Sequence, residues 1–202
     1  ALAGCGGMPL SSFCATAARD MEGVHACRGA GEIALLDSRA PGVSLEELAL
    51  IVQTVRKAAK RSGKPLKALF VMGDAAQGLD VLFRLARVYA HTVAHAVPAY
   101  VNRSAQMLDD AAEYLRMGGM VDISAKLHGD GGVAAPEALC ALMDRLGSLD
   151  GVILSGGAEF SPAAVADALR GALRLGLRLS EFIKTVSTNP ARAYGFAQGQ
   201  VK

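Results

Sequence analysis

The sequence predicts an α/β fold with a parallel sheet, because short apolar runs alternate with longer amphipathic segments along all 202 residues. The alternation amounts to about six β-then-α units separated by short loops. No linker, low-complexity tract or shift in composition divides the chain, so we expect residues 1–202 to form a single domain. Six units fit either an open doubly wound sheet or part of an eight-unit barrel, and periodicity alone does not separate the two.

Each predicted strand is an apolar run that precedes a helical segment. The first ends near Gly4 and is followed by a helix over about residues 11–21. A capping box opens the second helix, with Ser44 as N-cap and Glu47 three residues later, and the helix ends near Gly63. Further strands are expected at 33–36, 68–71, 99–101, 120–124 and 151–155, and further helices at 79–90, 105–117, 136–146 and from 161 onward.

Composition excludes several classes of protein. Hydrophobic residues make up 51% of the chain and the net charge is only +2, unlike a disordered chain, and no basic block indicates nucleic-acid binding. No apolar run reaches the roughly 20 residues that a membrane-spanning helix needs. Four widely spaced cysteines indicate free thiols in a reducing compartment, the cytoplasm or the mitochondrial matrix; they are Cys5, Cys14, Cys27 and Cys140.

Polar residues directly after the predicted strands mark the candidate site, since the carboxyl ends of parallel strands meet at one edge. Two of them are arginines, Arg39 and Arg103. A guanidinium there suits a carboxylate ligand through paired hydrogen bonds, while an ion pair with Asp37 or Asp74 explains it equally well. The same set includes Gly73, Asn102, Ser124, Lys126 and residues 155–159.

Histidines are too few for a typical metal centre. His91 and His95 have the i, i+4 spacing of a zinc pair on a helix, but no glutamate completes an HExxH motif. Both also precede a strand, at the end opposite the expected site. His25 is expected on the surface, and His128 follows a strand but stands alone. The glycine-rich stretches at 4–7 and 129–132 lack the spacing of nucleotide-binding loops.

The order of the strand-end motifs resembles the metal-dependent isoaspartyl dipeptidases (β-aspartyl peptidases) of the amidohydrolase superfamily. Residues 71–74, Val-Met-Gly-Asp, are similar to the family's His-Met-Gly-Asp, and residues 100–103, Tyr-Val-Asn-Arg, to its His-Val-Asn-Arg. Residues 2–9, 34–39, 121–124 and the tail 187–196 resemble further segments in the same order. The resemblance implies a (β/α)8 barrel with two bridged metal ions, usually zinc, that hydrolyse an isopeptide bond. This chain would then form a partial TIM-type barrel equivalent to strands 3–8, without the first two strands and the flanking β-sandwich.

At the metal site that the resemblance implies, this chain departs from the family. The bridging lysine falls on Glu32, the histidine ligands on Val71 and Tyr100, and the catalytic aspartate on Gly157. A tyrosine of the family's substrate chemistry falls on Gly6. Valine and glycine cannot bind zinc and tyrosine rarely does, which leaves Glu32 as the residual metal candidate. The positions that resemble the family's substrate-carboxylate contacts are retained; they are Arg39, Arg103 and Ser161.

Three functions follow from these observations. The leading hypothesis is a catalytically inactive amidohydrolase-like domain, with a degenerate metal site and no cofactor, that serves as a structural or binding subunit of a larger assembly. Its open barrel edges then need a protein partner or a missing N-terminal segment to cover them. The first alternative is an active zinc hydrolase of isoaspartyl dipeptides with a variant or shared metal site, using Glu32, Asp74, His128 or another chain. The second alternative is a module that binds an acidic small molecule through Arg39 and Arg103.

Overall fold

The structure is a computed structural model that describes residues 2–3, 10–35, 43–74, 77–127, 132–157, 161–197 and 199. Two compact units divide the chain: Ala1–Pro98 with Ala193–Gly195, and Ala99–Arg192 with Phe196–Lys202. Each unit has its own parallel strands and helices, so each is described by itself. That residues 1–202 form one barrel domain stays a prediction.

Parallel strands form the core of the first unit. Their order in the sheet is their order in the chain: β1 (Leu2–Ala3), β2 (Gly29–Leu35), β3 (Lys67–Met72) and β4 (Ala96–Ala99). The register places Leu35 opposite Met72. Alternate residues of β3 are fully buried, as expected for a strand with one face against a core; they are Ala68, Phe70 and Met72.

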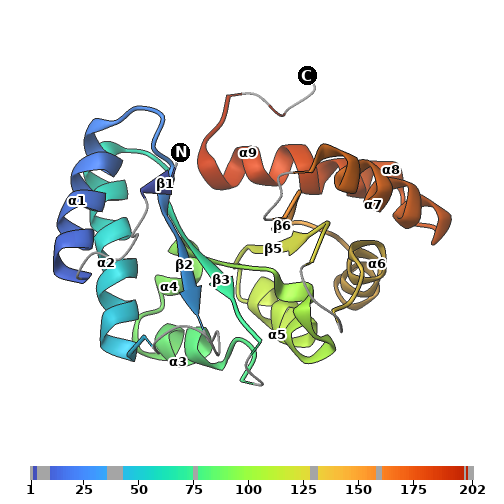
Figure 1. The fold of residues 1–202 in the computed structure, drawn as a ribbon, viewed down its shortest axis with the longest axis horizontal. Helices are drawn as coiled ribbons and strands as arrows, with labels where there is room; N and C mark the ends of the chain where they lie inside the picture. The colour runs from blue at the N-terminus through green and yellow to red at the C-terminus, as the bar shows by residue number, and fades with distance from the viewer. Residues whose placement is uncertain are drawn as a thin grey trace. The chain divides into compact units, whose positions relative to one another are not determined.

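Helices described in this unit are α1 (Leu10–Gly23), α2 (Leu45–Ser62), α3 (Asp80–Val88) and α4 (Thr92–His95). The predicted capping box begins α2: the Ser44 amide donates to the Glu47 carboxylate over 2.8 Å, and the Glu47 amide donates to the Ser44 hydroxyl over 3.2 Å. Gly63 ends α2 in the left-handed conformation, with φ 68°. α2 packs alongside α1 (Figure 1).

A reciprocal pair of hydrogen bonds fastens α4 to the beginning of β3. The Lys67 ammonium donates to the Ala94 carbonyl over 2.6 Å, and Nδ1 of His95 lies 3.2 Å from the Leu66 carbonyl oxygen. Because the carbonyl can only accept, Nδ1 carries the proton of the neutral imidazole. The two side chains therefore hold the short helix α4 to β3, which comes before it in the chain.

In the second unit, β5 (Val121–Ser124) pairs with Ala99, the last residue of β4, and with β6 (Val152–Ser155). Both pairings are parallel, with Ala99 opposite Asp122 and Ser124 opposite Ser155. Every residue of β5 is buried, which is typical of a parallel strand covered on both faces.

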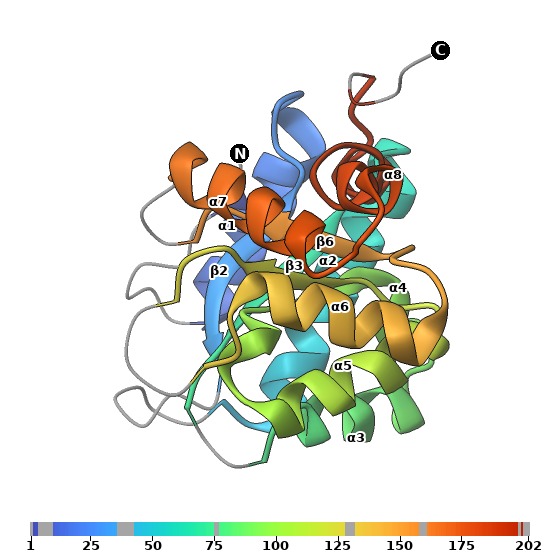
Figure 2. The same ribbon diagram turned by 90° about the vertical axis from the view of Figure 1, so that its right-hand side faces the viewer.

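Helices of the second unit follow its strands. The 3-10 turn η1 (Val101–Arg103) leads into α5 (Ala105–Arg116), and α6 (Ala135–Leu146) follows β5. α7 (Pro162–Arg174) follows β6, and α6 packs against both α5 and α7 (Figure 2). The chain then continues through α8 (Leu179–Ile183), the π-helix η2 (Lys184–Thr188) and α9 (Asn189–Tyr194).

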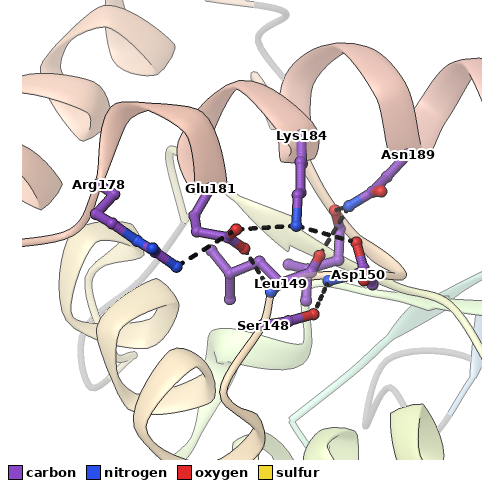
Figure 3. A network of polar contacts seen from close by, with 8 residues as sticks. Ser148, Leu149, Asp150, Arg178, Glu181, Lys184 and Asn189 are labelled. Atoms are coloured by element: carbon purple, nitrogen blue, oxygen red, sulfur yellow. Dashed lines mark hydrogen bonds and ion pairs between the residues drawn. The ribbon is translucent and has the colours of Figure 1, made fainter.

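A polar network holds this C-terminal segment to the residues around the beginning of β6 (Figure 3). The buried Glu181 carboxylate accepts hydrogen bonds from the Leu149 amide over 3.0 Å and from the Lys184 ammonium over 2.8 Å. Asn189 is also buried, and its side-chain amide donates to the carbonyls of Leu149 and Val152 over 2.8 and 2.7 Å. The network therefore satisfies three backbone groups where β6 begins.

Charges within this network keep its carboxylate ionised. Burial alone would raise the pKa of Glu181, but the hydrogen bonds from Lys184 and Leu149 and the charges of Lys184 and Arg178 outweigh burial and hold that pKa below its usual value. The same bond to Glu181, aided by Asp150 at 3.4 Å, raises the pKa of Lys184. Glu181 and Lys184 therefore form a charged pair at neutral pH.

The alternation of strands and helices confirms the predicted α/β class. One strand lies elsewhere than expected: residues 99–101 were expected to be extended, whereas β4 is Ala96–Ala99 and η1 follows. Pro98 has no N–H to donate, which weakens the strand signal of these residues, and the left-handed Tyr100 ends the strand. Among the described cysteines, Cys14, Cys27 and Cys140 are free thiols. None of the helices in the described ranges is long and apolar enough to span a bilayer.

Candidate functional site

The candidate site of the second unit lies at the carboxyl ends of β5 and β6 and in the turn after β4. Parallel pairing brings Ser124 and Ser155, the last residues of their strands, opposite each other. The Ser155 hydroxyl donates to the Asp122 carboxylate over 2.9 Å, so Asp122 is buried with a polar partner. This edge of the second unit is where a ligand is expected to bind in an α/β fold.

Tyr100 and Arg103 form the aromatic–cation pair of this site. Tyr100 has φ 61° and ψ 34°, a left-handed conformation that is uncommon for a bulky side chain. The 3-10 turn that follows brings the Arg103 guanidinium over the Tyr100 ring, 5.3 Å from its centroid, in cation–π geometry. Nε of Arg103 is buried and has no hydrogen-bond partner within the described ranges. A buried donor without a partner at a strand end suits an anionic ligand.

Asn102, between these two residues, is a buried clamp. Its side-chain amide donates to the carbonyls of Ser124 and Val133 over 3.1 and 2.9 Å, and its side-chain oxygen accepts the Ser124 amide over 3.0 Å. Its own carbonyl accepts the Val133 amide over 2.8 Å. Asn102 therefore fixes both ends of the connection between β5 and α6.

Gly157 lies two residues beyond β6, in a left-handed conformation with φ +77°. A Cβ at this position would lie 2.6 Å from the Ser124 hydroxyl oxygen and closer still to the Lys126 carbonyl oxygen. Both separations are below 3.0 Å, which real Cβ atoms essentially never show. This backbone therefore has no room for any side chain at residue 157.

Three of the predicted site residues, Glu32, Val71 and Asp74, belong to the first unit. Glu32 is an exposed residue of β2, and Val71 is a half-buried residue of β3. Asp74 is exposed, just beyond the end of β3, where the Gly73 amide continues the ladder by donating to the Leu35 carbonyl over 2.7 Å. Valine offers no atom that binds a metal ion, so at most Glu32 and Asp74 present donors here.

The remaining predicted residues have different outcomes. Ser161 is the N-cap of α7, where its hydroxyl accepts the Ala164 amide over 3.2 Å, so its side chain has a structural partner. Arg39, His128 and Gly6 lie outside the described residues.

His91 and His95 lie before the amino end of β4, as predicted from their place before a strand in the sequence. Burial lowers the pKa of His91, and the nearby Arg56 lowers it further. Burial also lowers the pKa of His95; the Leu66 carbonyl acts in the opposite direction, while Lys67, His91 and Arg56 add to the lowering. Both imidazoles are therefore uncharged at neutral pH, and their cationic neighbours disfavour a bound metal cation.

Sequence reasoning selected Asn102 and Ser124 as polar strand-end residues but did not find their mutual hydrogen bonds. Ser155 was also selected as a strand-end residue, but its partner, the buried Asp122, was not. The signal in the sequence was the carboxylate of Asp122 in an otherwise apolar strand, because a buried carboxylate requires a polar partner.

The chain is similar to proteins of known structure. No family model matches the chain. Among the solved structures that match are two that cover 92% of it, both of the β-aspartyl dipeptidase of the thermophilic, keratin-degrading Fervidobacterium islandicum AW-1. One is 30% identical with a TM-score of 0.83; the other, in complex with the β-Asp-Leu dipeptide, is 28% identical with a TM-score of 0.81. The chain spans about half of each, 51% and 53% of their lengths.

These matches confirm the resemblance to the β-aspartyl dipeptidases of the amidohydrolase superfamily, and the α/β architecture is that of a partial TIM-type barrel. On the correspondence drawn from the motifs, two metal-binding histidines fall on Val71 and Tyr100 and the catalytic aspartate on Gly157. The first has no donor atom, the second lies under a guanidinium, and the third has no space for a side chain. Within the described ranges no three His, Cys, Asp or Glu side chains group as metal ligands would.

Proposed function

This chain is related to the β-aspartyl dipeptidases of the amidohydrolase superfamily, and on that premise we propose that it is a non-hydrolytic relative. Its barrel domain, residues 1–202, serves as a structural or binding subunit of a larger assembly. It uses no metal ion or other cofactor, and it acts in the cytoplasm or the mitochondrial matrix.

The observation that carries this proposal is the Tyr100–Arg103 pair. The position that the resemblance assigns to a metal-binding imidazole holds a phenol ring, and a guanidinium lies 5.3 Å from its centroid. The family's own motif also carries the arginine, so the difference lies in the ring: tyrosine rarely binds zinc, whereas the imidazole at this position in the family does. Glu32 is the remaining metal candidate, and one exposed carboxylate does not hold zinc by itself.

The role in an assembly rests on the strand edges. In the part of the chain that the structure describes, β1 pairs with β2 and β6 pairs with β5, and no second partner strand is found for either. A parallel edge without a second partner strand leaves amides and carbonyls for other polypeptide to cover, although at β6 the Asn189 side chain already bonds to the Val152 carbonyl. The chain also spans only about half the length of the matched dipeptidases. A protein partner or a further segment of the same protein is the proposed cover.

The test is metal content and turnover of the full-length protein that contains this chain. Purified from cells grown with added zinc, it should hold far less than one zinc ion per chain by mass spectrometry. It should also not hydrolyse the β-Asp-Leu dipeptide above a no-protein control. Stoichiometric zinc together with turnover would show that the protein is an active hydrolase and end this proposal.

A carboxylate-binding role is the second candidate, and it is favoured by the buried Nε of Arg103, which has no partner among the residues that the structure describes. The probe is succinate, a simple dicarboxylate, measured by calorimetry. Arg103→Ala should abolish binding, while Arg170→Ala, which removes an arginine from an exposed helical ion pair, should leave it intact. Absence of succinate and β-Asp-Leu binding to the unmodified protein would exclude this role.

A further inference from the structure

We propose that the backbone after β5 has closed over position 157, so that the lost carboxylate cannot be restored by replacing Gly157. The inference rests on the proposed function, because it explains why the chain stays non-hydrolytic. It concerns backbone geometry, however, so it can be tested by measuring stability, without an activity assay.

Two oxygen atoms occupy the space that a side chain at residue 157 needs. A Cβ there would lie 2.6 Å from the Ser124 hydroxyl oxygen, closer still to the Lys126 carbonyl oxygen and 3.4 Å from the Lys126 carbonyl carbon. A flexible side-chain end could move aside at little cost, but a carbonyl moves only with its backbone. The contact with Lys126 is therefore the one that excludes a side chain.

The Lys126 carbonyl is held by one hydrogen bond and by two neighbouring residues that are themselves fixed. The Ser124 hydroxyl donates to it over 2.6 Å. Next to it, the Ala125 amide continues the β5–β6 ladder by donating to the Ser155 carbonyl over 2.8 Å. Ser124 itself is fixed through its amide and its carbonyl by the side chain of Asn102. Moving the carbonyl away from residue 157 would break the bond that it accepts from the hydroxyl of Ser124, a buried residue, which is costly.

The conformation of Gly157 adds a second obstacle, and the chain contains a matched glycine that separates the two. Gly147, which ends α6, has φ 74°, almost the same as the φ 77° of Gly157, but a Cβ there would meet nothing within 4 Å. A substitution at Gly147 therefore feels only the left-handed backbone. A substitution at Gly157 has the same backbone strain and, in addition, the close contacts with the two oxygen atoms.

The first experiment compares Gly157→Ala with Gly147→Ala in the full-length protein by urea unfolding. The unfolding midpoint should fall about twice as far or more for Gly157→Ala, because overpacking is added to conformational strain. The inference is also supported if Gly157→Ala fails to fold while Gly147→Ala folds. Equal shifts would overturn the inference.

The second experiment assigns the effect to this contact. Ser124→Ala removes both the hydroxyl and the hydrogen bond that holds the Lys126 carbonyl, so it should partly rescue Gly157→Ala and leave the effect of Gly147→Ala unchanged. Strictly additive shifts in the Ser124→Ala/Gly157→Ala double variant would overturn the assignment to the Lys126 carbonyl.

The third experiment tests the functional consequence. Adding Gly157→Asp to a Val71→His/Tyr100→His variant should lower the urea midpoint and give no gain in bound zinc or in β-Asp-Leu hydrolysis. A gain of zinc and turnover specific to the triple variant would overturn the inference. Zinc and turnover in the unmodified protein would instead overturn the proposed function, and the alanine comparison would still decide the closure.

Discussion

Replacing Glu181 by glutamine should destabilise the protein far more than the same change in a matched surface pair. Glu181 and Lys184 are three residues apart on a helical segment, as are Glu113 and Arg116 in α5. The Glu181 side chain is 7% exposed, whereas the Glu113 side chain is 59% exposed. The two glutamine variants therefore make the same chemical change in a buried and in an exposed i, i+3 pair.

The magnitude follows from the two bonds that Glu181 accepts. A hydrogen bond to a charged group contributes roughly 1.5–3 kcal/mol and a neutral one roughly 0.5–1.5 kcal/mol, so neutralising the carboxylate weakens each bond by about 1 kcal/mol. Lys184 is one-third exposed, and solvent reduces its share. Glu181→Gln should therefore cost about 2 kcal/mol, and Glu113→Gln about 0.5 kcal/mol or less.

The measurement is the free energy of unfolding by urea, followed by circular dichroism, at several pH values. Because the pKa of Glu181 is held below its usual 4.5 in the folded protein, its contribution is complete above pH 4.5 and is lost as the pH falls through the lowered pKa. The gap between wild type and Glu181→Gln should therefore be constant near neutral pH and narrow below 4.5. The reasoning is refuted if Glu181→Gln lies within 0.5 kcal/mol of Glu113→Gln at pH 7.

Further predictions concern other polar contacts, all measured by urea unfolding. Asn102→Asp should cost about 2–4 kcal/mol, because the buried Ser124 carbonyl and the half-buried Val133 carbonyl lose their donor and face a carboxylate instead. A loss below 1 kcal/mol would contradict the clamp. Ser44→Ala should cost about 1 kcal/mol through the lost N-cap, and an unchanged midpoint would argue against the capping box. His91 and His95 have lowered pKa values, so the unfolded chain takes up protons first and stability should decrease as the pH falls below 6.5. A His91→Gln/His95→Gln variant should show a smaller decrease, and an equal one would refute this origin.

Local features of the fold were readable in the sequence because their signals lie within a few residues. The capping box of Ser44 and Glu47 needs only its own helix turn, and Ser161 precedes a helix with proline at its first position. Tyr100 is the counterexample. Its left-handed conformation lies next to Asn102, whose side chain bonds to residues 22 and 31 positions away, and no local pattern encodes that.

The candidate site was predictable in its residue types and not in its geometry. The motifs assigned Gly157 to the position of a catalytic aspartate, but the Lys126 carbonyl that fills the space beside it belongs to another strand end. Backbone groups carry no sequence signature, so their positions follow from the folded chain alone. For the same reason, the amide of Leu149, 32 residues from Glu181, could not be predicted as the partner that this buried carboxylate requires.

The double donation by Asn189 sets a boundary for any shorter version of this protein that is designed for expression. A fragment that ended at residue 188 would remove the Asn189 amide from the carbonyls of Leu149 and Val152 at the point where β6 begins. The Leu149 carbonyl would keep the Val152 amide as a donor, but the buried Val152 carbonyl would lose its bond to Asn189. Loss of a buried hydrogen bond costs roughly 1–3 kcal/mol, a sizeable part of the net stability of a typical domain. The smallest fragment that keeps β6 in place must therefore extend past Asn189, although that residue is 34 positions beyond the end of the strand it supports.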